Sequence, residues 1–118
     1  MRIWVDGQCF QTPSSTRGIG RYVADFLIAM AARDDVELII SLNANLRDAA
    51  FAARQYLNII LPDVRIESWY GIANASESER GWTAQRKADG QILAEHIHMI
   101  EPDICLLYTS DAADDTPC

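Results

Sequence analysis

The residues best suited to chemistry lie in a polar, glycine-containing stretch at residues 6–22, which follows a short apolar run. Glycines there allow a ligand to approach the backbone closely, and the first turn of a helix offers free N–H groups and a positive dipole end. Two arginines flank the glycines and are suited to pairing with an anion. The stretch therefore predicts a binding site for a phosphate or a sugar hydroxyl, formed by Arg17, Gly18, Gly20 and Arg21.

Several familiar phosphate-binding motifs are excluded. The pattern G-x-x-x-x-G-K-[ST] is absent, so the stretch is not a P-loop. Gly18 and Gly20 supply half of G-x-G-x-x-G, but Val23 occupies the last glycine position, and the connection is longer than the tight turn of a dinucleotide site. We therefore expect neither NAD nor FAD, and no cofactor. The alternative is that the glycines only let the chain turn and the helix pack.

Other chemically capable residues favour structural roles. His96 and His98 are two positions apart on a predicted helix, so they face different sides, and no metal site is expected. His96 is predicted at the edge of the core and His98 at the surface. Cys9, with no histidine beside it, is predicted to be a small buried residue. Asp6 ends the first strand and is either a functional carboxylate or a cap for loop amides, and the cap is favoured.

Strands and helices alternate along the chain. Strands are predicted at Arg2–Val5, Val36–Leu42 and Val64–Tyr70, and the last of these alternates in polarity as expected near a sheet edge. Helices of this length between strands imply right-handed crossovers. The prediction is an α/β fold with a Rossmann-like, three-layer parallel sheet.

Periodicity and capping residues define three predicted helices. The first buries a stripe made of Ile19, Tyr22, Val23, Phe26, Leu27 and Met30. The second begins near Asn45 as N-cap, with Asp48 reaching back, and Pro62 stops it. The third begins near Ser76 and ends before Pro102, with an inner stripe of Ile92, Leu93, His96, Ile97 and Ile100.

Composition limits the classes of partner. The net charge is −7, and no basic cluster is present, so nucleic acid is not expected as a partner. No apolar run reaches the ~20 residues of a membrane span, and the opening apolar run is too short for a signal peptide. The expected location is therefore cytoplasmic.

The C-terminal run, residues 105–118, is similar to the translation of a transposase sequencing adapter. We interpret it as a non-native tail and residues 1–104 as a partial domain. The alternative is a genuine strand at Cys105–Thr109 followed by a polar tail.

The opening M-R-I-W-V-D, the long polar loop and R-G-I-G-R-Y resemble the start of family 4 glycosyltransferases, including bacterial mannosyltransferase-like members. The resemblance covers residues 1–104 and is most specific at residues 17–22. It implies the N-terminal half of a GT-B fold, with Gly18, Ile19 and Gly20 in the interdomain cleft. Arg17 and Arg21 extend that site.

The function that the resemblance implies is transfer of a sugar from a nucleotide-sugar donor to a glycan or lipid-linked acceptor, with retention. It also implies a missing C-terminal domain of the same chain, no required metal, and a possible peripheral position at the inner membrane face. The family's E-x7-E motif belongs to that domain, so no catalytic residue is carried over, and the fragment alone is expected to be inactive. The rival hypotheses are a non-catalytic Rossmann-like module for a phosphorylated or sugar ligand, and a flavodoxin-like interaction domain.

Overall fold

A computed structural model of the chain describes residues 1–11, 18–71 and 82–106. Its strands are β1 (Arg2–Asp6), β2 (Glu37–Asn43), β3 (Arg65–Trp69) and β4 (Ile104–Leu106), and they form one sheet in the order β3-β2-β1-β4. All strand pairs are parallel. The prediction of a Rossmann-like α/β fold with a parallel sheet is confirmed, and so is the place of β3 at a sheet edge.

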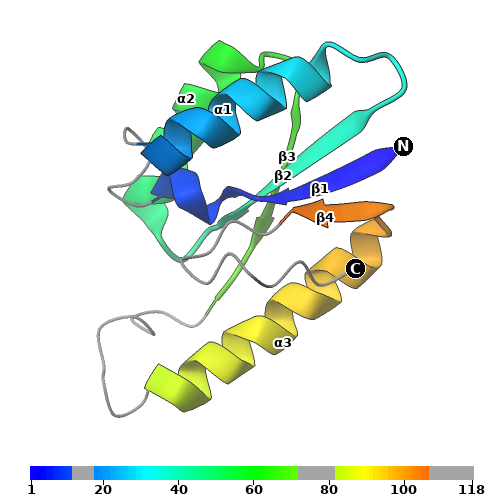
Figure 1. Cartoon of the computed structure of the whole chain (residues 1–118). Helices are drawn as coiled ribbons and strands as arrows, with labels where there is room; N and C mark the ends of the chain where they lie inside the picture. The colour runs from blue at the N-terminus through cyan, green and yellow to red at the C-terminus, as the bar shows by residue number, and fades with distance from the viewer. Residues whose placement is uncertain (12–17, 72–81, 107–118) are drawn as a thin grey trace.

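Helices cover both faces of this sheet (Figure 1). A 3-10 helix, η1 (Gly7–Gln11), follows β1 directly, and α1 (Gly18–Ala31) leads to β2. The helices α1 and α2 (Arg47–Ile60) lie on one face, whereas α3 (Trp82–Ile100) lies on the other. This is the arrangement expected of right-handed crossovers that run from β1 to β2 and β3 in one direction and then return from β3 across the sheet to β4.

Each face of the sheet carries its own apolar cluster, because successive strand residues point to opposite faces. Val5 and Ile40 pack with Val23, Leu27 and Leu57 of α1 and α2. On the opposite face, a smaller cluster joins the sheet to α3 and consists of Trp4, Ile39, Ile100, Leu93, Ile97 and Cys105.

Two expectations about the first two helices are corrected. Tyr22 is 67% exposed, because the buried stripe centres on Val23 and Leu27 and leaves Tyr22 at its margin. Asn45 is not the N-cap of α2. The N-cap is Leu46, without a side-chain cap, because the backbone N–H of Asn45 donates to Asn43 Oδ1 over 3.1 Å and the chain turns once more before the helix begins.

Three further predictions concern the start of α3, its inner stripe and residues 105–118. The predicted cap at Ser76 lies outside the described residues, and the inner stripe of α3 ends, as predicted, on buried Ile100. β4 includes Cys105 and Leu106, which pair with Trp4 and Val5. Strand pairing is a backbone property, so the interpretation of residues 105–118 as non-native stays a prediction.

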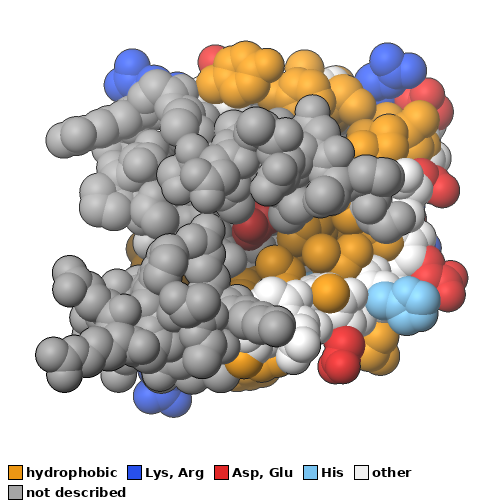
Figure 2. Space-filling view, turned by 60° about the horizontal axis from the view of Figure 1, so that its bottom comes forward, with side chains coloured by type: hydrophobic (Ala, Val, Ile, Leu, Met, Phe, Trp, Pro, Cys, Tyr) orange, Lys and Arg blue, Asp and Glu red, His pale blue; other side chains and the backbone are white. Residues whose placement is uncertain are grey.

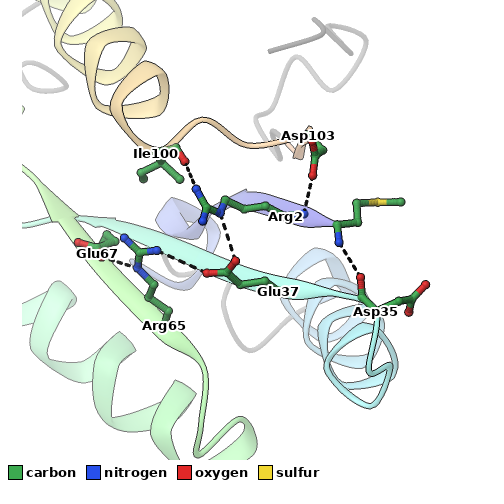
Figure 3. Close-up of polar contacts among 8 residues, drawn as sticks. Arg2, Asp35, Glu37, Arg65, Glu67, Ile100 and Asp103 are labelled. Carbon is green, nitrogen blue, oxygen red and sulfur yellow. Dashed lines mark hydrogen bonds and ion pairs between the residues drawn. The ribbon is translucent and has the colours of Figure 1, made fainter.

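A ladder of ion pairs holds the amino edge of the sheet (Figure 3). Glu37 of β2 pairs with Arg2 of β1 at 3.2 Å and with Arg65 of β3 at 3.5 Å. Arg2 also donates to the carbonyl of Ile100 over 2.6 Å, which satisfies a free acceptor at the C-terminus of α3. The opposite edge, at the carboxyl ends of the strands, carries the segments that follow them.

Candidate functional site

The strand order defines where a ligand would bind. β1 lies between β2 and β4 in the sheet. The chain first adds β2 and β3 on one side of β1 and then adds β4 on the other side, so the order of strands reverses between β1 and β4. In open α/β sheets, ligands bind outside the carboxyl ends of the strands at this reversal. The candidate site is therefore the carboxyl end of β1 with the segment that follows it, η1 and the start of α1.

Asp6 is the last residue of β1 and is 2% exposed. One of its oxygens, Oδ1, accepts a hydrogen bond from the backbone N–H of Gln8 over 3.0 Å, which confirms the predicted capping role. Burial raises the pKa of the carboxyl from 3.8 to about 6, and the bond from Gln8 opposes that shift. Asp6 thus combines a structural bond with a pKa close to neutrality.

Gly7 is fixed by the close approach of η1 to β2. A Cβ built there would lie 2.7 Å from both the carbonyl oxygen of Ser41 and Cδ2 of Leu42. Because the Ser41 oxygen belongs to the backbone of a central strand, it cannot move aside. The chain can leave β1 along this path only with glycine at position 7.

Gln11 ties the end of η1 to the end of β2. Its Nε2 donates to the carbonyl of Asn43 over 2.8 Å, and its Oε1 accepts from the N–H of Asn43 at 2.9 Å. Both residues are buried, so two backbone groups at the end of a strand are satisfied by one amide side chain. This pair gives the segment before α1 a fixed starting point.

The side chain of Asn43 then joins the ends of β2 and β3. Its Oδ1 accepts from the N–H of Gly71 over 3.2 Å, in addition to the N–H of Asn45. Phe10 of η1 contacts Tyr56 of α2, with ring centroids 5.9 Å apart. These contacts join η1, α2 and the ends of β2 and β3 at the carboxyl edge of the sheet.

The predicted site residues lie at the beginning of α1. Gly18, Ile19 and Gly20 form its first turn, in which no acidic residue is present, and Arg21 is exposed in the next position. Arg17 lies outside the described residues. The first turn of α1 thus presents backbone N–H groups and the positive end of the helix dipole, with no acidic residue of its own.

Sequence reasoning missed Gly7, Gln11 and Asn43. The glycine after Asp6 was a usable signal, because a glycine directly after a strand often marks a close backbone approach. The Gln11–Asn43 pair spans 32 positions and had no local signal.

The remaining candidates lie as predicted. Cys9 is buried, and burial together with the charge of Asp6 raises its pKa to about 12, so the thiol is unreactive at neutral pH. His96 is half-buried and His98 exposed. Within the described ranges, no three or more metal-ligating side chains are arranged to hold an ion.

A hollow of about 500 Å³ lies at the opposite, amino edge, between the ends of α1 and α2 and the start of β2. Its lining is mainly apolar, with Ile28, Val36, Ile60 and Val64 among its residues. Because it lies at the edge opposite to η1 and the start of α1, it is not part of the candidate site. No helix in the described segments has the length and apolar character needed to cross a membrane.

Comparison of the chain with protein-family models, with curated proteins and with solved structures finds no match in any of the three.

Proposed function

We propose that this chain is the N-terminal half of a GT-B sugar transferase, and that η1 and the first turn of α1 form its wall of the catalytic cleft. The observation that supports this proposal is positional. The glycine-containing helix start predicted from sequence begins α1, the first α-helix after β1 and η1, and β1 borders the reversal of strand order.

The chemistry of that helix start suits a phosphorylated sugar donor. The first turn of α1 presents N–H groups at a positive dipole end, and Arg21 adds an exposed cation beside it. The partners in this proposal are a nucleotide-sugar donor and a glycan or lipid-linked acceptor, and they meet between this half and a second α/β domain of the same chain. Retention at the sugar and action at the cytosolic face belong to the same proposal.

The direct test is to resequence the source locus across codon 104. The proposal expects the reading frame to continue into a second α/β domain with an E-x7-E motif, in place of residues 105–118. A frame that ends at Cys118 would contradict it and favour a non-catalytic module. That alternative also predicts saturable binding of a phosphorylated or sugar ligand by the 118-residue chain itself.

A second test uses the complete protein and a panel of nucleotide sugars. Gly20→Ala places a methyl group at the helix start, and Arg21→Gln removes the cation, so each is expected to lower kcat/KM by about tenfold or more. The matched controls are Gly90→Ala, where a Cβ would have nothing within 4 Å, and Arg54→Gln on α2. Transfer that is equally fast in the site variants and in the controls would exclude this site.

A further inference from the structure

A buried chain of hydrogen bonds connects three elements on the α3 face of the sheet. The indole N–H of Trp4 in β1 donates to Ser41 Oγ in β2 over 2.8 Å. The same oxygen lies 2.7 Å from Nε2 of His96 in α3. Trp4 and Ser41 are fully buried and His96 is half-buried, so the chain of hydrogen bonds runs from the core toward the helix surface.

The bonding capacity of the three groups assigns the protons. An indole nitrogen can only donate, and a serine hydroxyl carries one hydrogen. Since Ser41 Oγ accepts from Trp4, its own hydrogen needs an acceptor, and His96 Nε2 is the one within reach. The imidazole must then be neutral, with its proton on Nδ1. The reverse arrangement would leave a hydroxyl hydrogen unsatisfied in the core, which is costly.

Charged groups surround the ring on several elements. In register with Ser41 stand Asp6 of β1 and Glu67 of β3, and Arg65 donates to Glu67 over 2.7 Å. Glu37 of β2 lies farther along the same face, paired with Arg2 and Arg65. On α3 itself, Glu95 and His98 are exposed.

The balance of these influences keeps the imidazole neutral. Burial lowers the pKa of His96 from its usual 6.5, and the charge of Glu67 opposes the shift without cancelling it. His96 therefore remains an acceptor at neutral pH and gains a second N–H only on acidification.

We propose that His96 is a pH-sensitive latch, which holds α3 and the following β4 on the sheet while its ring is neutral. A protonated ring carries N–H groups on both nitrogens, so Nε2 can no longer accept the hydrogen of Ser41. α3 ends at Ile100 and β4 begins at Ile104, so the helix and the strand are released together. Because β4 borders the reversal of strand order, acid loosens that side of the carboxyl edge. The latch does not depend on the proposed transferase activity.

The sign follows from linkage. The folded pKa lies below the unfolded value of 6.5, so the unfolded or released state binds the proton more tightly. The stabilisation by His96 is present above 6.5 and is lost as the pH falls from there through the lower folded pKa. Asp6 acts in the opposite sense, so the latch is measured against His96 variants and not from the wild type alone.

The test is a pH titration of the whole chain by NMR, with amide hydrogen exchange. At about pH 7.5 the ring of His96 should carry its proton on Nδ1, and its pKa should lie below the usual 6.5 of a histidine. Between about pH 7.5 and about pH 5.5, β4 amides should lose about tenfold in protection relative to β2 amides, after correction for intrinsic rates. His96→Gln retains an acceptor for Ser41 without titrating, so the loss of β4 protection relative to β2 on acidification should disappear. His98→Gln, two positions away and exposed, should behave as wild type.

Two results would overturn the latch. One is a ring of His96 protonated on Nε2 at neutral pH, which can be observed in the wild type even if a variant fails to fold. The other is a loss of β4 protection in His96→Gln on acidification that equals the loss in His98→Gln.

Discussion

Asp6 is a single residue whose charge works against the stability of the fold. Its pKa of about 6, against 3.8 when unfolded, corresponds to about 3 kcal/mol at neutral pH. With a raised folded pKa, the stabilisation is present below 3.8 and is lost as the pH rises through about 6. Asp6→Asn keeps an acceptor for the N–H of Gln8 and removes the charge. We expect its free energy of unfolding to exceed that of wild type by about 2 to 3 kcal/mol at neutral pH, and by little near pH 4. Urea unfolding at both pH values measures this, and an equal gain at both would show that charge is not the cause.

Gly7 and Gly90 form a matched pair of glycines with opposite expectations. Gly7→Ala drives a methyl group against the backbone of β2, so we expect a loss of about 1 to 3 kcal/mol in the free energy of unfolding. Gly90 lies inside α3 with nothing within 4 Å of a built Cβ, so Gly90→Ala should stabilise by about 1 kcal/mol. Urea denaturation of both variants measures these changes in the free energy of unfolding. A Gly7→Ala variant as stable as wild type would mean that η1 can move away from β2.

At the scale of elements, the Gln11–Asn43 pair fixes η1 to the sheet. Gln11→Ala leaves the N–H and the carbonyl of Asn43 without their partner in a buried position. We expect a loss of about 2 to 4 kcal/mol in the free energy of unfolding and faster exchange of the Asn43 amide. Gln8→Ala, three residues earlier in η1 and half-exposed, is the control and should change stability little. Unchanged exchange at Asn43 in Gln11→Ala would contradict the role of the pair.

Element positions were predictable where periodicity was strong. Val23 and Leu27 are buried as their helical spacing predicted, because amphipathic helices must cover an apolar sheet. The start of α2 was not predictable from Asn45. The Oδ1 of Asn43 accepts from the N–H of Asn45, which follows β2, and from the N–H of Gly71, which follows β3, so it fixes the turn before the helix. Local capping patterns cannot anticipate a bond that depends on a neighbouring strand.

At the scale of the whole molecule, alternation of strands and helices was enough to predict the layers of the sheet. It was also enough to predict the candidate site after β1, because ligand sites of parallel sheets lie at carboxyl ends. The links that hold this edge, from Gln11 to Asn43 and from Ser41 to His96, join residues 32 and 55 positions apart. Such links follow from tertiary packing, so sequence patterns alone did not reveal them.

The last prediction concerns the edge of the sheet at β4. In the part of the chain that the structure describes, β4 pairs with β1 and with no strand on its other side. Ile104 is 40% and Met99 84% exposed near this edge, and apolar side chains reach the surface beside acidic ones (Figure 2). Unpaired edges with apolar side chains promote association, and a lysine on the edge opposes it.

We expect the 118-residue chain to self-associate with rising concentration, and Ile104→Lys to reduce this association. Sedimentation velocity over a concentration series measures it, with Ile59→Lys on α2, where Ile59 is 79% exposed, as the matched control. If Ile59→Lys reduces association as much as Ile104→Lys, the contact lies on the helical surface and not at β4.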